Sequence, residues 1–67
     1  MDLAAELAAR DMSVNIYIRA KNVHITLIKA DGNWAGKSQF RQGPAIFDII
    51  EGEIERLLEG CDETTDL

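Results

Sequence analysis

The chain has 67 residues, of which twelve are acidic and seven are basic, and its formal net charge is −5. This length predicts one small domain over residues 1–67, and a hydrophobic content of 46% is too high for a disordered chain. A single cysteine excludes an internal disulfide, and with a single histidine it excludes the usual zinc sites, so we expect no cofactor. The negative charge disfavours non-specific binding to nucleic acid or to an anionic membrane.

Location and assembly follow from the same numbers. No apolar run approaches the roughly 18 residues of a membrane span, and the start MDLAAELAAR has neither a basic region nor an apolar signal core. We therefore expect a cytoplasmic protein. Because a short chain buries a small fraction of its surface, we also expect support from association, most simply as a homodimer.

The first element is a short helix that Asp2 can cap and that runs to about Arg10. Two strands follow, because apolar and polar side chains alternate in VNIYIRAK and again in VHITLIKA. A tight turn at Lys21-Asn22 joins them in this prediction. That turn would pair Ala20 with Val23 and Ile18 with Ile25, which keeps the apolar residues on one face.

A favoured two-residue turn at Asp31-Gly32 predicts a third strand that begins near Asn33. This register sets Leu27 opposite Gly36 and places four residues of the strand on the core face. They are Trp34, Gly36, Ser38 and Phe40. A turn displaced by one residue would instead bury Lys37, which is costly without a partner.

A long helix is predicted from Pro44 to Glu59, with Gly60 as its stop. Its apolar stripe comprises Ile46, Phe47, Ile50, Ile54, Leu57 and Leu58. We expect the core to span about residues 14–59 and the acidic residues 61–67 to form a flexible tail.

These elements predict an α+β fold of order α-β-β-β-α, a three-stranded antiparallel meander with the long C-terminal helix packed on one face and a short N-terminal helix. The order resembles that of the double-stranded RNA-binding domain. In that family the final helix starts with basic residues, whereas this one starts with GPAIFDII. The resemblance therefore implies a topology and not an RNA-binding function.

Residues Gly36-Lys37-Ser38 match the end of a nucleotide-binding P-loop. Only three residues separate Gly32 from Gly36, where the pattern needs four, and Asp31 stands where the first glycine belongs. A P-loop also opens a helix after a strand, whereas Lys37 lies within a predicted strand. We therefore read this stretch as a hairpin and not as a phosphate loop.

No residue set predicts catalysis. His24 is expected on the surface without a nucleophile in reach, and Cys61 follows a helix end with acidic neighbours, which disfavours a thiolate. We therefore expect the protein not to be an enzyme.

One side of the long helix is acidic, and we name it the acidic stripe: Asp48, Glu51, Glu55 and Glu59. The plain interpretation is a solvated face. The sharper one, which we take as the expected function, is a non-enzymatic regulator or inhibitor that docks this stripe on a protein partner with a basic surface and blocks it. Small acidic phage-encoded inhibitors of host machinery are similar in size and charge, which makes this a comparison by analogy.

The other face of the sheet is predicted to be basic, with Tyr17, Arg19, Lys21, Lys37 and Arg41. A basic sheet with an exposed aromatic side chain can stack on and grip single-stranded nucleic acid, which gives a nucleic-acid-binding regulator as the alternative. A structural subunit of a homo-oligomeric assembly is a third interpretation.

Overall fold

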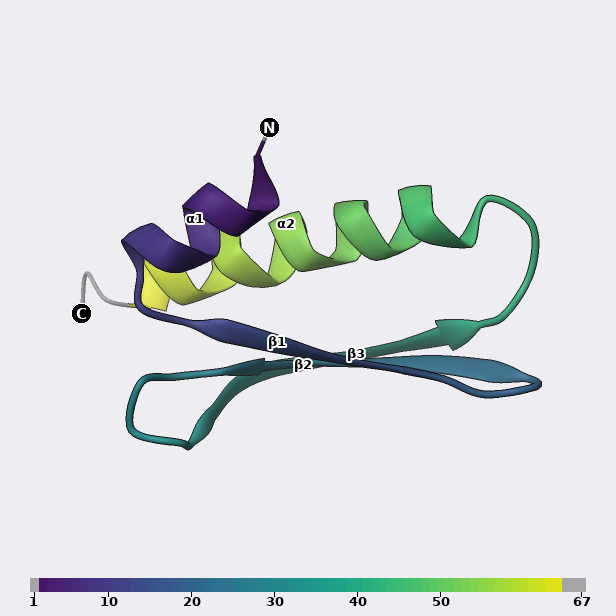
Figure 1. The fold of residues 1–67 in the computed structure, drawn as a ribbon, viewed down its shortest axis with the longest axis horizontal. Helices are drawn as coiled ribbons and strands as arrows, with labels where there is room; N and C mark the ends of the chain where they lie inside the picture. Colours follow the sequence, from purple (N-terminus) through teal and green to yellow (C-terminus); the bar gives the residue numbers. More distant parts are fainter. Residues whose placement is uncertain (1, 65–67) are drawn as a thin grey trace.

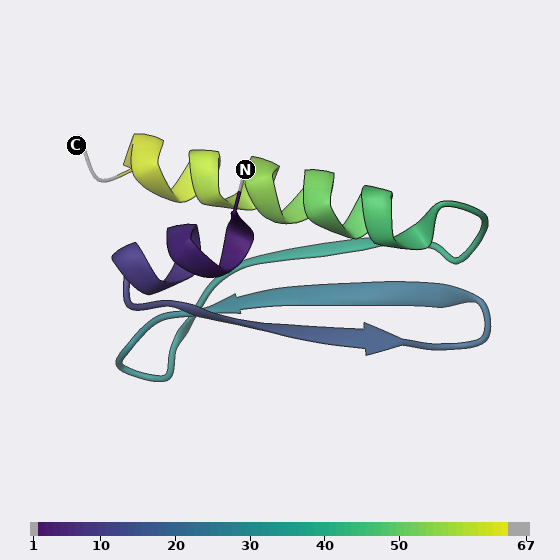
Figure 2. The ribbon, with the colours of Figure 1, turned by 45° about the horizontal axis from the view of Figure 1, so that its top comes forward.

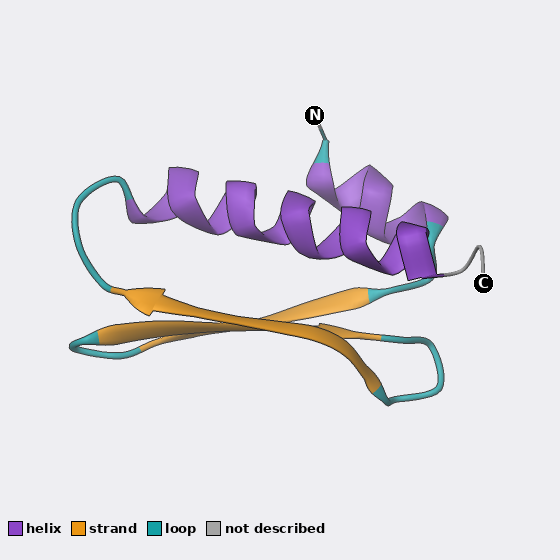
Figure 3. Ribbon diagram, turned by 180° about the vertical axis from the view of Figure 1, so that it is seen from behind, coloured by secondary structure: helices purple, strands orange, loops and turns teal. Residues whose placement is uncertain are grey.

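The computed structural model describes the backbone of residues 2–64 and the side chains of residues 2–61. The elements are α1 (Leu3–Ala9), β1 (Ser13–Ile18), β2 (Asn22–Ile28), β3 (Trp34–Arg41) and α2 (Ile46–Thr64). The strands form one antiparallel sheet in the order β1-β2-β3, and both helices lie on the same face of it (Figures 1 and 3). The predicted α+β fold and its meander are thus confirmed. We call the face under the helices the inner face and the opposite one the outer face.

Helix α1 has a capped start and a defined end. The carboxylate of Asp2 accepts a hydrogen bond from the Ala5 amide at 3.3 Å. At the other end Asp11 adopts the left-handed conformation (φ 54°), and the Met12 amide donates to the Leu7 carbonyl at 2.9 Å. This is the bonding of a Schellman cap, which turns the chain into β1. Figure 2 shows α1 beside the C-terminal half of α2.

The turn between β1 and β2 lies one residue earlier than predicted, at Ala20-Lys21, where the Arg19 amide donates to the Asn22 carbonyl at 2.8 Å. The predicted partnership of Ala20 with Val23 is therefore wrong, because Ala20 is in the turn. The observed pairs are Val14 with Leu27, Ile16 with Ile25, and Ile18 with Val23. Since the pairing shifts by two residues, every side chain keeps its predicted face.

The pairing between β2 and β3 has the predicted register over most of its length. Leu27 lies opposite Gly36, Ile25 opposite Ser38, and Val23 opposite Phe40. Gly36 leaves room for the helix above, because a β-carbon placed on it would lie 3.4 Å from Leu57 Cδ2.

The loop before β3 differs from the predicted two-residue turn. It has three residues, 30–32, closed by a hydrogen bond of 2.8 Å from the Lys29 amide to the Asn33 carbonyl, and Gly32 supplies the positive φ of 91°. A bulge at Ala35 compensates for the extra residue, so that Trp34 lies opposite Ile28 on the outer face. The prediction that Trp34 faces the core is therefore wrong.

Helix α2 begins two residues later than predicted. Ala45, with a φ of 58°, precedes it and accepts a hydrogen bond from the Ile49 amide at 3.1 Å. The expected stop at Gly60 is wrong, because the helix continues to Thr64. Residues 61–64 of the expected flexible tail are thus helical, and 65–67 lie outside the described residues.

The core forms between the central strand and α2. Its buried side chains are Val23, Ile25, Leu27, Ile50, Ile54 and Leu58. Ile46 and Leu57 pack against this cluster as predicted, but Phe47 does not and is 74% exposed. The place of Phe47 in the predicted buried stripe is therefore wrong, and this side of the first helical turn is open.

Candidate nucleic-acid interface

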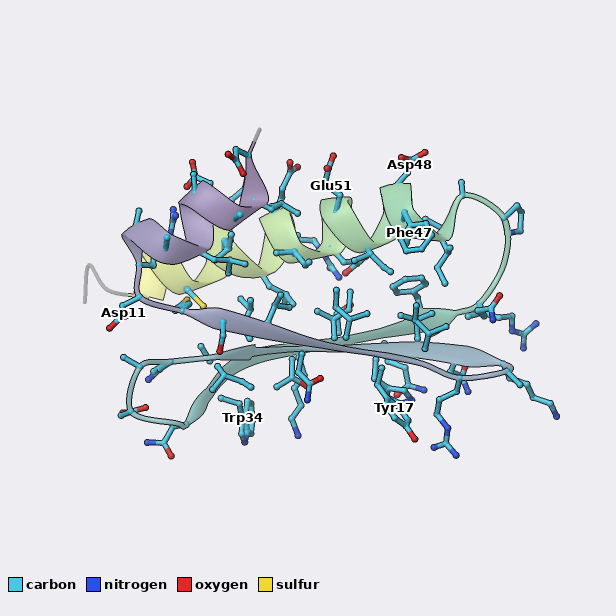
Figure 4. All side chains as sticks on the ribbon, viewed as in Figure 1. Asp11, Tyr17, Trp34, Phe47, Asp48 and Glu51 are labelled. Atoms are coloured by element: carbon cyan, nitrogen blue, oxygen red, sulfur yellow. The ribbon has the colours of Figure 1, made fainter. Side chains whose placement is uncertain are left out.

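The outer face of the sheet carries rows of side chains set by the strand register. One row runs from Tyr17 through His24 to Gln39, and the next from Asn15 through Thr26 to Lys37. Arg19 and Arg41 flank Asn22 at one end of the sheet, and Ser13, Ile28 and Trp34 form the row at the other end. Figure 4 shows Tyr17 and Trp34 projecting from the face opposite the helices.

Trp34 reaches this face because of the bulge. In an uninterrupted strand residues 34 and 37 would point to opposite faces. Here both lie on the outer face, and the Lys37 ammonium lies 4.5 Å from the centroid of the Trp34 ring. The ring is nevertheless 61% exposed, so most of its surface is open to solvent.

Tyr17 forms a second unit of the same kind. The guanidinium carbon of Arg19 lies 5.6 Å from the centroid of the Tyr17 ring, because residues two apart in a strand share a face. The tyrosine is 59% exposed. The outer face thus presents two exposed aromatic rings, each beside a cation.

The two rings are well separated. They lie two rows and two strands apart, which corresponds to about 13 Å along the strands and about 10 Å across them. They therefore cannot enclose one planar group between them. Each ring is instead open to a separate planar group.

Between the rings the face is polar. A surface hollow of about 220 Å³ is lined in part by His24, Thr26, Lys37 and Gln39. These side chains present a positive charge and hydrogen-bonding groups to solvent. Lys21, predicted on the sheet face, lies in the β1–β2 turn, where it lines a second hollow with Arg41.

The acidic stripe lies on α2, away from the sheet. Asp48, Glu51 and Glu59 are exposed and Glu55 is half-buried. Figure 4 shows Asp48 and Glu51 pointing away from the sheet. Among the residues the structure describes, no ion pair involves these four carboxylates. The molecule is therefore bipolar, with a basic outer face and an acidic helix.

Glu53, beside the stripe, has a structural role. Its carboxylate accepts a hydrogen bond of 2.7 Å from the Ser38 hydroxyl and pairs with Arg56. The Ser38 hydrogen bond, followed by Arg56, holds the pKa of Glu53 below its ordinary value of 4.5. These contacts join α2 to the inner face of β3.

Replacing Ser38 with alanine should lower the free energy of unfolding by about 1 kcal/mol at neutral pH. Folding lowers the pKa of Glu53, so the ionised carboxylate stabilises the folded state. This stabilisation is complete above pH 4.5 and is lost as the pH falls through the pKa of Glu53 in the folded protein. The difference between Ser38→Ala and wild type should therefore shrink in acid. Urea denaturation at pH 7 and at about pH 3 measures this, and an equal difference at both values would contradict the role of the ionised carboxylate.

The structure also bears on two kinds of site considered from the sequence, a metal site and a phosphate-binding loop. No three His, Cys, Asp or Glu side chains of residues 2–61 lie close enough together to hold a metal ion. The stretch Gly36-Lys37-Ser38 lies in β3, with Lys37 on the outer face and Ser38 on the inner one. It does not form a phosphate-binding loop.

No protein-family model, curated protein or solved structure matches this chain. The sequence predicted Tyr17, Arg19, Lys37 and Arg41 on the outer face, and the structure adds Trp34. Sequence reasoning missed Trp34 because it lies three residues before Lys37. That spacing puts the two residues on one face only if a bulge lies between them.

Proposed function

We propose that the protein binds single-stranded nucleic acid on the outer face of its sheet. The observation that carries this proposal is the pair of exposed rings, Tyr17 and Trp34, each beside a cation on one face of the sheet. Stacking of a base on an aromatic side chain contributes about 1–3 kcal/mol, and nearby cations attract the phosphates. Such a site tolerates many base sequences, because every base has a face that can stack.

Single strands fit this surface better than duplexes. The face is a shallow sheet surface whose groups lie in rows, and in a duplex the bases are already stacked on one another. The net charge of −5 does not oppose the proposal, because the acidic stripe lies on the other side of the molecule. The local charge of the outer face decides the binding.

The test is a fluorescence titration, since Trp34 is the only tryptophan of the chain. Adding oligothymidylate at low salt should quench its emission to saturation, and a duplex of equal length should quench it less. Heparin serves as a control, because it supplies anionic charge without bases. Absence of saturable quenching by the single strand, or equal quenching by heparin, would argue against stacking on Trp34.

A second candidate is the regulator that docks its acidic stripe on a basic protein. The exposure of Asp48, Glu51 and Glu59 favours it. The two candidates differ in the variants that matter. If the stripe is the binding site, Glu51→Lys with Glu55→Lys abolishes capture of the protein partner and leaves the Trp34 titration unchanged.

A further inference from the structure

We propose that β1 is a dimerisation edge that pairs with β1 of a second copy of this chain to form a continuous six-stranded sheet. The strand is at the edge of the sheet, since the order is β1-β2-β3. It contains no charged residue and no proline in Ser13–Ile18. Edge strands of monomers usually carry such residues to prevent pairing.

The opposite edge is protected. Strand β3 carries Lys37 and Arg41 and is interrupted by the bulge at Ala35. Charges and bulges are two devices that stop an edge from accepting another strand. Only the β1 edge of this sheet is therefore open to pairing, which favours a closed, two-fold dimer over an open chain of β1-to-β3 contacts.

The backbone of β1 is self-complementary. The Arg19 amide bonds to β2, and in an antiparallel ladder the bonding residues alternate. The amides and carbonyls of Val14, Ile16 and Ile18 therefore point to the free edge. A two-fold axis at Ile16 pairs Ile16 with Ile16 of the second copy and Val14 with Ile18 of the second copy. Each of these outward amides and carbonyls then finds a partner.

The exposed apolar side chains at this edge also favour a second copy of the chain as the partner. Ile16 is 39% exposed and Ile18 is 48% exposed on the inner face, because α2 packs over β2 and β3 and α1 reaches only one end of β1. Phe47 lies eleven residues before Leu58, so both point to nearly the same side of α2. Leu58 is buried, whereas Phe47 is open. In the dimer Ile16 meets Ile16 of the second copy and Ile18 meets Val14 of the second copy, and these contacts cover this apolar surface.

The second copy suits this edge better than a foreign peptide does, because one register satisfies both chains with the same three residues. The pairing brings no charged side chains opposite each other within Ser13–Ile18. It also adds burial to a domain whose described core has six buried side chains. Association through this edge depends on apolar contact and backbone hydrogen bonds, so added salt should not dissociate it.

The test compares two variants by analytical ultracentrifugation over a range of protein concentrations. Ile16→Lys should weaken dimerisation by about 100-fold, because two lysines would then face each other at the two-fold axis. Ile49→Lys is the matched control, because Ile49 has nearly the same exposure (38%) but lies on α2. The wild type and Ile49→Lys should sediment as dimers, and Ile16→Lys as a monomer.

A monomeric wild type, or an Ile16→Lys protein that remains dimeric, would overturn the proposal. If Ile16→Lys fails to fold, amide hydrogen exchange of the wild type decides. The amides of Val14, Ile16 and Ile18 should exchange more slowly as the protein concentration rises, whereas those of Asn15 and Tyr17, bonded to β2, should not change. Concentration-independent exchange at all five positions would reject the β1 edge.

Discussion

Replacing Ile25 with alanine is expected to lower the free energy of unfolding by a large part of its total. Ile25 is fully buried at the centre of the middle strand, between Ile16 on β1 and Ser38 on β3, and α2 covers it. Truncating a buried isoleucine costs about 2–5 kcal/mol. A chain of 67 residues has roughly 3–10 kcal/mol of stability in total. The substitution therefore removes a large part of the whole.

Urea denaturation followed by circular dichroism measures this effect. Ile49→Ala is the control, because the same truncation at a partly exposed site should cost less than about 1 kcal/mol. An Ile25→Ala protein with the midpoint of the wild type would contradict the location of the core. The proposed dimerisation would add to the apparent stability, so both variants should be compared at equal protein concentration.

The elements with strong periodicity were predictable from the sequence. In β2 every second residue is apolar and lies under α2, and Ile50, Ile54 and Leu58 recur at helical spacing. The alternation determines which face each side chain takes. The pairing of β1 with β2 differs from the predicted pairing by two residues, and every side chain therefore stays on its predicted face. Such patterns predict the fold because each gives its strand or helix one apolar face, and that face must be buried against another element.

The failures have local causes. The sequence cannot distinguish a two-residue turn from a three-residue loop followed by a bulge, because both give the same register from Leu27 to Val23. That ambiguity placed Trp34 on the wrong face. Phe47 fits the apolar stripe of α2, but whether a stripe residue is covered depends on how far α1 extends over the sheet.

The candidate site was predictable in part for the same reasons. Alternation placed Tyr17, Arg19 and Lys37 on the outer face, and the second ring became visible only with the bulge at Ala35. One exposed tyrosine is a weak platform for bases, whereas two rings beside two cations support stacking and phosphate attraction together. This second ring is why we propose the outer face, and not the acidic stripe, as the binding site.

Reversing the charges of Arg19 and Lys37 together should weaken binding of single-stranded nucleic acid by about 100-fold at low salt. Each of these cations lies beside one of the stacking rings, so the reversal places a carboxylate where a phosphate is expected. The logarithm of affinity against the logarithm of salt concentration should also become less steep by about 1.4, since two phosphate contacts are lost.

The matched control is the double variant Lys29→Glu with Arg56→Glu, which changes the net charge by the same amount. Lys29 lies beside the β2–β3 turn and Arg56 lies on α2, over the inner face. Neither forms one of the two cation–ring pairs of the outer face. If only the total charge mattered, both double variants would lose affinity equally. Circular dichroism should verify that both are folded before they are compared.

The most direct test of the outer face as the nucleic-acid site is the fluorescence anisotropy of a labelled oligothymidylate titrated with these two double variants and the wild type. We predict that the wild type and Lys29→Glu with Arg56→Glu bind with affinities within a few-fold of each other, and that Arg19→Glu with Lys37→Glu loses about 100-fold. Equal affinities of the two double variants, or no binding by the wild type at low salt, would contradict it.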